Sequence, residues 1–485
     1  MTDRYYVGTD PVDPGLGKSA FGDTIAVRKK PVAGIRATYG ILTNAETFTA
    51  SGGSVAATDN NFVLQTGTTV GGYGVIWQRQ PVVYQQGVGV EAVGTAMFTA
   101  GVASSQQGWG LFSTNDGMFF GYDGTTFGLM HRYGGKVEIR TISVTASATG
   151  AETVTVTLNG TAYTASVTNT TATNNAHEIT AALEAGAANS LWKFQHIGTT
   201  VVCTYRGNGA KSGTYSVTST GTLTATVAQT AAGVAATENW TARTSWNVDK
   251  ATWLDPTKGN IYRVSFAHLG YGPLTWEVFN PSTNKFVVVH RIAWSNAYTT
   301  PNFGNASMRA GWFSASLGST TNLTVKGCNT ATFLQGDRFD GRHFGASGAA
   351  TGVTTETQVL TVQVRNEFGG RVNNGVLVPT LATLSTDSTK GAIFRFLRNP
   401  TVSGNTAHAY VDQTESLAIT DTAGTTVSGG RVLAVVSVGP SGRTTVDLDR
   451  INALLIAGDE LVITARVVSG AASDMSAAVS WEEIV

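Results

Sequence analysis

The stretch from 112 to 140 constrains the fold more than any other part of the sequence. It holds three short runs of aromatic and β-branched residues, GMFFGY, TFGLMHRY and KVEIR. The dipeptides Asp-Gly at 123–124 and Gly-Gly at 134–135 separate these runs, and both supply the positive φ that tight hairpin turns require. We therefore predict a three-stranded β-meander on which a β-sandwich is built.

The residue composition and hydrophobic pattern change after this meander, and the earlier pattern resumes at Trp240. Residues 36–142 and 236–334 carry short alternating runs separated by Gly, Asn and Asp, whereas residues 143–235 are rich in Thr, Ala and Val. We predict that the two outer segments form one discontinuous β-sandwich, and that the middle segment is a domain inserted into it.

The inserted segment has its own secondary-structure pattern. Two alternating runs flank Asn159-Gly160, which is a strong hairpin-turn signal. Apolar residues at helical spacing predict a helix over 174–188, capped by Asn174 or Asn175. Three further strand-like runs follow, so we expect a small β-β-α-β-β-β module.

The two ends of the chain differ from this centre. Residues 1–35 contain Pro, Gly and a basic trio with weak apolar periodicity, which predicts an extended N-terminal attachment arm. Residues 335–354 are Gly-rich and read as a linker. Residues 355–485 hold at least seven alternating runs, typical of a β-sandwich or jelly roll. The predicted fold class is mainly β, with two antiparallel β-sandwich or jelly-roll domains, the first interrupted by the α+β insertion.

Charge and composition narrow the classes of partner. The 485 residues include only 13% charged residues, with 32 basic and 32 acidic ones, and no run of charge longer than a few residues. This balance argues against nucleic acid as a partner, because phosphate binding needs a clustered basic face. The start of the chain is polar and no apolar stretch is long enough to span a bilayer, so we expect neither a signal peptide nor membrane insertion. The two cysteines, Cys203 and Cys328, are predicted to be free thiols.

Motifs for catalysis or metal binding are scarce. Nucleophile-elbow, P-loop and zincin patterns are all missing, and no pair of carboxylates has the spacing of a glycosidase. Glu482 and Glu483 are adjacent, so a strand would turn them to opposite faces, and we expect them to be solvated. Asp337, Asp340 and His343 lie in the Gly-rich segment, where solvated side chains are the simpler interpretation. We predict no enzyme activity, no cofactor and no metal.

Aromatic residues are the remaining candidates for a site. A dense group follows the insertion, and a two-sheet core of this size needs most of them. Exposed members would stack on sugar rings or anchor a protein partner. The candidate contacts for a glycan or partner are Trp240, Trp246, Trp253, Tyr271 and Trp294.

Several stretches resemble virion structural proteins of tailed bacteriophages. They include GWGLFSTNDGMFFGYDGTTFGLMHRYGG, LDPTKGNIYRVSFAHLGYGPLTWEVFNP, the module run VTVTLNGTAYTASVTN and the terminal run DLDRINALLIAGDELVITARVV. The resemblance covers most of residues 36–485. It implies a virion component of the tail, baseplate or fibre type with a concanavalin-like lectin sandwich, and it carries over no catalytic residue.

The resemblance leaves the role of the protein open. The favoured hypothesis is a non-enzymatic structural protein, built as a homotrimer and assembled in the host cytoplasm. It would contact other virion proteins, and a host cell-surface glycan is a further candidate partner. One alternative is a capsid decoration, collar or head-fibre protein. A further alternative is a glycan-binding adhesin or a depolymerase.

Overall fold

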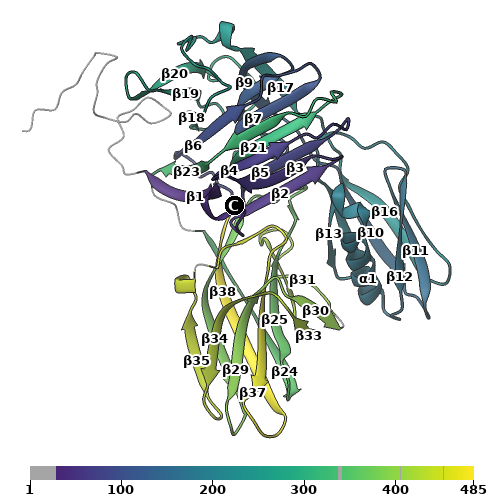
Figure 1. The fold of residues 1–485 in the computed structure, drawn as a ribbon. Coiled ribbons are helices and arrows are strands. Elements are labelled where there is room, and N and C mark those ends of the chain that lie inside the picture. Colours follow the sequence, from purple (N-terminus) through teal and green to yellow (C-terminus); the bar gives the residue numbers. More distant parts are fainter. Residues whose placement is uncertain (1–28, 337–340, 405, 452) are drawn as a thin grey trace, which may run out of the picture. The chain divides into compact units, whose positions relative to one another are not determined.

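The computed structural model describes residues 29–336, 341–404, 406–451 and 453–485. It is mainly β, with many antiparallel strands and one α-helix among these residues, which confirms the predicted fold class (Figure 1). The chain forms two compact units. The first holds residues 29–112, 117–131 and 238–336, and the second holds 113–116, 132–237 and 341–485.

The first unit is a sandwich of two large antiparallel sheets. One sheet runs in the order β20 (Lys285–Ile292), β19 (Leu274–Asn280), β18 (Asn260–Phe266), β6 (Gly89–Phe98), β22 (Thr324–Gly327), β4 (Asn61–Gln65) and β3 (Ser54–Thr58), with β23 (Asn329–Gln335) on β6 and β1 (Lys30–Arg36) on β23. The other sheet runs in the order β17 (Thr237–Ala242), β9 (Thr126–Tyr133), β8 (Gly117–Asp123), β7 (Ser105–Phe112), β21 (Arg309–Ser316), β5 (Tyr73–Gln78) and β2 (Ala45–Ala50).

Glycines in one sheet make room for tryptophans of the other. An added Cβ at Gly94 in β6 would lie 2.4 Å from the indole nitrogen of Trp109, and one at Gly327 would lie 2.2 Å from that of Trp312. Both tryptophans are fully buried in the core between the sheets. The indole of Trp312 also donates to the Thr95 carbonyl at 2.9 Å. The two sheets can therefore approach closely because glycine, which has no side chain, lies opposite each of these tryptophans.

The predicted meander is correct for two of its three strands. β8 and β9 form around Gly124, whose φ is +56°. KVEIR is not the third strand, because its last two residues begin β10 (Ile139–Ala146), which pairs with strands of the inserted module. Ile142 and Val144 of β10 are buried in the module core, and this burial determines the pairing.

The module has two sheets and a helix. The strands of one sheet are β13 (Trp192–Ile197), β14 (Thr200–Tyr205), β10 and β16 (Thr224–Ala231), and those of the other are β12 (Thr161–Val167), β11 (Glu152–Leu158) and β15 (Ser216–Ser219). The hairpin of β11 and β12 turns at Asn159-Gly160, both at positive φ, as predicted. Ile139 pairs with Ala231, and Lys136 bridges Val234, so the two ends of the module are neighbours.

The helix α1 spans Ala172–Ala185, close to the predicted range. Its N-cap is Thr171 rather than Asn174 or Asn175, since the Thr171 hydroxyl accepts from the Asn174 amide at 3.4 Å. Asn175 is buried instead, where its side chain accepts from the Ala148 amide at 3.0 Å and donates to the Asn169 carbonyl at 2.8 Å. Short 3-10 turns occur at η1 (Ala37–Tyr39), η2 (Ala187–Ser190), η3 (Arg243–Ser245) and η4 (Asp449–Ile451).

The C-terminal domain is a second sandwich. One sheet contains β24 (Arg342–Val353), β38 (Ser473–Ile484), β28 (Val376–Thr386), β35 (Arg443–Asp447) and β36 (Leu455–Ile456). The facing sheet contains β31 (Ala409–Tyr410), β32 (Ala418–Asp421), β25 (Thr357–Val364), β37 (Glu460–Val467), β29 (Ala392–Arg398) and β34 (Arg431–Val438). Two small ribbons pair β26 (Glu367–Phe368) with β27 (Arg371–Val372) and β30 (Thr401–Gly404) with β33 (Gly424–Ser428).

Two expectations about the chain's segments are wrong. The predicted linker over 335–354 is largely the strand β24, because Arg342 to Ala350 pair residue by residue with β38. The last residues of the predicted arm over 1–35 form β1, which pairs with β23 in the first sandwich. Residues 1–28, with the rest of that arm, lie outside the described residues.

The expectation that Glu483 is solvated is also wrong. It is buried rather than solvated, because β38 extends to Ile484 and pairs with β28. One carboxylate oxygen accepts from the Ser416 hydroxyl at 2.7 Å and from the Trp481 indole at 2.8 Å. The other accepts from the Leu417 amide at 2.7 Å.

Candidate functional site

Two loops at one end of the first sandwich carry exposed aromatic side chains. One loop joins β18 to β19, and the other follows β20. Because β18, β19 and β20 are neighbouring antiparallel strands, the carboxyl ends of β18 and β20 lie at the same edge of the sheet. The strand order therefore places these loops side by side.

Asn302 ties the two loops together. Its amide donates to the Gly270 carbonyl at 2.8 Å, and its side-chain nitrogen donates to the Gly272 carbonyl at 2.9 Å. Its carbonyl accepts from His131 at 2.8 Å, and its side-chain oxygen bonds His268. Asn302 is fully buried, so both loops are anchored from inside the protein.

The outer side of these loops presents Leu269, Tyr271 and Tyr298, which we call the tyrosine surface. Tyr271 is 38% exposed and Tyr298 is 46% exposed. The Tyr271 hydroxyl donates to the Thr299 carbonyl at 3.0 Å, which links the two loops at their tips. Leu269 has a φ of +37°, an uncommon conformation for a bulky residue and one that often marks functional loops.

Trp294 supports Tyr298 from below. The two rings stack with centroids 3.7 Å apart and planes within 13°. Trp294 is itself buried, and its indole donates to the Thr300 carbonyl at 2.6 Å. The His131 ring packs against it nearly perpendicularly, with ring centroids 5.1 Å apart. Tyr298 is therefore held flat, with its other face open to solvent.

The groups beneath the tyrosine surface are uncharged at neutral pH. Burial lowers the pKa of His131 to about 4, partly opposed by its bond to Asn302. Burial also lowers the pKa of His268, again against a hydrogen bond to Asn302. The surface thus offers flat apolar faces and phenol hydroxyls, which suits stacking on the apolar face of a sugar or on a protein side chain.

The structure separates the five predicted contact residues into exposed and buried ones. Tyr271 belongs to the tyrosine surface, and Trp253, 39% exposed, lies in a different loop between η3 and β18. Trp240 is half-buried against the apolar outer cluster around Phe112.

The prediction is wrong for Trp246 and Trp294 as surface contacts. Both are buried, and Trp246 packs between Phe120 and Phe127 in the core, with its indole donating to the Thr241 carbonyl. Sequence reasoning missed Tyr298. Its signal was its position in the Ser-, Asn- and Thr-rich run SNAYTTPN, four residues after Trp294.

The remaining sequence candidates form no site in the described part of the chain. Asp337 and Asp340 lie outside the described residues, and His343 is exposed on β24. Within the described ranges, no group of three or more His, Cys, Asp or Glu side chains is arranged to hold a metal ion. Cys203 and Cys328 are free thiols, and burial raises the pKa of Cys203. No helix among the described residues is long and apolar enough to cross a bilayer.

Comparison with known proteins gives likenesses to lectin folds. No family model matches the sequence, and no curated protein matches it. Arcelin-5 from Phaseolus vulgaris, a lectin-like defense protein, is 7% identical, with a TM-score of 0.25 over 62% of this chain and 99% of its own. A lectin from Bauhinia forficata, solved with GalNAc, is 11% identical, with a TM-score of 0.22 over 63% of this chain and 98% of its own.

A third solved structure is the carbohydrate recognition domain of Emp46p. It is 10% identical, with a TM-score of 0.24 over 61% of this chain and 90% of that domain. At these identities and TM-scores, the likenesses assign neither a ligand nor a binding residue to this chain.

Proposed function

We propose that this protein is a non-enzymatic structural component of a tailed-phage virion that attaches to a glycan through its tyrosine surface. The observation that carries the attachment role is the pair Tyr271 and Tyr298, exposed on loops that the buried Asn302 anchors. Rigid aromatic side chains lose little entropy when a ligand binds, so a surface built this way suits recognition.

The virion role rests on the sequence resemblance and is consistent with the architecture. The chain carries two β-sandwiches and an inserted α+β module, with low charge and a net charge of +0. A chain with no net charge has little electrostatic repulsion between its copies, which suits a homotrimer in the tail, baseplate or fibre. Capsid decoration, collar and head fibre are the alternative locations.

Substitution of Tyr298 tests the glycan-binding role. With the full chain and immobilised host-envelope polysaccharide, we expect Tyr298→Ala to weaken binding about tenfold, the equivalent of losing about 1.4 kcal/mol of stacking. Tyr39→Ala is the matched control, because Tyr39 is 67% exposed in the same unit but lies in η1. Equal binding by the wild type and the Tyr298 variant would contradict the proposal.

Labelling of intact virions tests the structural role and its location. Gold-conjugated antibody against residues 355–485 is expected at the tail end, and sedimentation of the purified chain is expected to give three times 50.6 kDa. Gold over the head or neck would move the protein to the alternative locations. Virions without label, together with a folded monomer in solution, would refute the virion role.

A further inference from the structure

Within the second unit, the edge of the inserted module bonds directly to the C-terminal domain. The Gly198 amide donates to the His408 carbonyl at 2.7 Å. The Asn366 amide donates to the Gln195 side-chain oxygen at 2.9 Å, and the Asn366 side chain donates to the Phe194 carbonyl at 3.0 Å. β13 is the edge strand of its sheet, and the other domain satisfies its Phe194 carbonyl. We call this contact the module junction.

The apolar part of the module junction is small. Ile139, Ile197 and Val202 of the module meet Ile419 and Tyr410 of the C-terminal domain in a minor cluster. Each of the two domains has a much larger core of its own. Separation at the junction would therefore expose little apolar surface and leave both cores intact.

Three histidines occupy the module junction. His196 Nε2 lies 2.9 Å from His408 Nδ1, with the two rings nearly perpendicular. The ring of His177 on α1 packs against His196 with centroids 4.9 Å apart. His196 and His408 are both buried. A hydrogen bond between two imidazole nitrogens needs one donor and one acceptor, so the pair cannot hold a proton on both facing nitrogens.

We propose that the module junction is released by acid: the module and the C-terminal domain stay bound while His177, His196 and His408 are neutral, and they separate as these histidines take up protons. The separation is a movement of two intact domains and requires neither of them to unfold. It is independent of the tyrosine surface, which belongs to the other unit.

Two carboxylates near the three histidines favour the protonated form of the imidazoles. Asp421 is buried and attracts protons to His408 and His177, while its carboxylate accepts from the Gln358 side chain and the Ala407 and Ala423 amides at 2.9–3.0 Å. Glu178 on α1 also favours the charged form of His177.

Burial outweighs these attractions and lowers the pKa of each of the three histidines, and mutual repulsion lowers those of His196 and His408 further. A lowered pKa in the bound state stabilises the junction above about pH 6.5, and this contribution is lost as the pH falls below that value.

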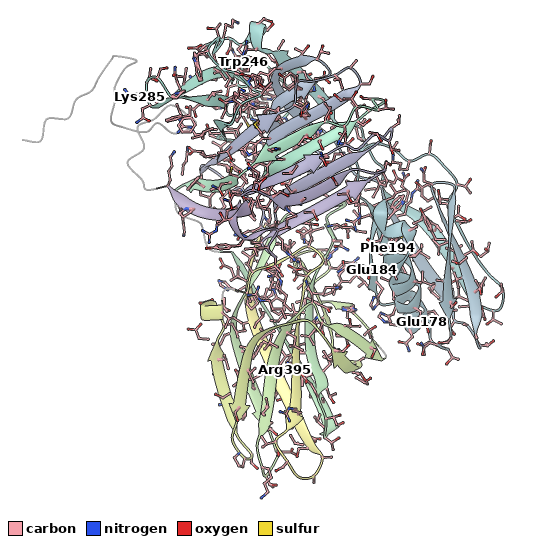
Figure 2. All side chains as sticks on the ribbon, viewed as in Figure 1. Glu178, Glu184, Phe194, Trp246, Lys285 and Arg395 are labelled. Carbon is pink, nitrogen blue, oxygen red and sulfur yellow. The ribbon has the colours of Figure 1, made fainter. Side chains whose placement is uncertain are left out.

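One carboxyl group at the same junction opposes this effect. Burial raises the pKa of Glu460 on β37 to about 7, and Glu184, Asp421 and Asp459 raise it further. Glu184 on α1 is exposed, so water screens the rise in its own pKa, which Arg206 also opposes. Figure 2 shows Glu184 on α1 and Phe194 on β13. A raised pKa stabilises the junction at low pH, and this contribution is lost as the pH rises through about 7.

The sum of the two effects gives a measurable slope. As the pH falls below about 6.5, separation takes up protons on the three histidines, and release of a proton from Glu460 partly offsets this uptake. The equilibrium constant for separation should therefore rise on acidification, by about tenfold per pH unit for each net proton taken up. The Glu460→Gln variant lacks the opposing carboxyl group and should show a steeper rise.

Hydrogen exchange of the full chain tests the proposal. After correction for intrinsic exchange, the Gly198 and Asn366 amides should lose protection as the pH falls from 6.5 to 5, while the amides of β11 and β37 stay protected. Protection of Gly198 and Asn366 that does not change with pH would overturn the proposal. Simultaneous loss of protection in β11 or β37 would also overturn it, because acid would then be unfolding the domains.

Variants separate the histidines from other acid effects. His177→Gln removes one site of proton uptake, so the separation constant should rise less steeply on acidification, by at most about tenfold less per pH unit. Protection of the same two amides at pH 7.5 checks that the domains of this variant still dock. His131→Asn is the matched control, since it removes a buried histidine of the other unit and should leave the slope unchanged. An unchanged slope in the His177 variant, or an equal effect in the His131 variant, would refute the role of the histidine cluster.

Discussion

At the scale of single residues, the first sandwich depends on side chains that are missing as much as on those present. Gly94 and Gly327 lie where the indoles of Trp109 and Trp312 need space. A methyl group at either position would fall well inside van der Waals contact with a buried ring that has no room to move. These two glycines are therefore required by packing, and neither has a positive φ.

We expect Gly94→Ala to lower the free energy of unfolding of the first unit by about 3 kcal/mol, because the Trp109 ring must shift or the sheets must part. Urea denaturation followed by tryptophan fluorescence measures this change. Gly259→Ala is the control, since an added Cβ there meets nothing within 4 Å, and its effect should stay within about 0.5 kcal/mol. Equal stability of the two variants would contradict the packing argument.

The residue scale also shows the limit of sequence reasoning for the site. Trp246 and Trp253 stand seven positions apart in the same irregular stretch, yet one is buried and the other is 39% exposed. Composition predicted that this stretch would hold both core and surface aromatics. The choice between them depends on Phe120 and Phe127, which lie more than a hundred positions earlier in the chain. Long-range packing of this kind leaves no local pattern to read.

At the scale of elements, the alternating and turn-bounded strands were predicted well and the weakly patterned ones were not. The β11–β12 hairpin has the turn that Asn159-Gly160 predicts. β24 was mistaken for a linker because its sequence, RHFGASGAATGV, has Gly and Ala where apolar alternation is usually read. It is a strand because it pairs with β38, which is held in the core by the buried side chains of Met475, Val479 and Trp481.

The start of α1 offers a test of capping against burial. Thr171→Ala should destabilise the helix by about 1 kcal/mol, since it removes the acceptor of one amide at the end of the helix. Asn175→Ala should cost more, about 2 kcal/mol, because it leaves the Ala148 amide and the Asn169 carbonyl without their bonds to it. Hydrogen exchange of the α1 amides gives both values. A larger loss for Thr171→Ala than for Asn175→Ala would reverse this ranking.

At the scale of the whole molecule, the predicted fold class holds, while the grouping of segments needed the structure. The sequence showed where the residue composition and hydrophobic pattern change along the chain. Such a boundary does not tell which strand each neighbouring segment will pair with. β10 illustrates this, because KVEIR continues the meander in sequence and belongs to the module in space. The module junction was likewise beyond sequence reasoning, since His196 and His408 are 212 positions apart.

The neighbouring ends of the module have a consequence for how such a chain changes over generations. Ile139 and Ala231 are paired, as are Lys136 and Val234, so the chain leaves the module close to where it enters. The coding segment for the module can therefore be gained, lost or exchanged for another of different length without stretching the sandwich that hosts it. Related genes should differ most by whole cassettes bounded at these two pairs, with the host strands on either side retained.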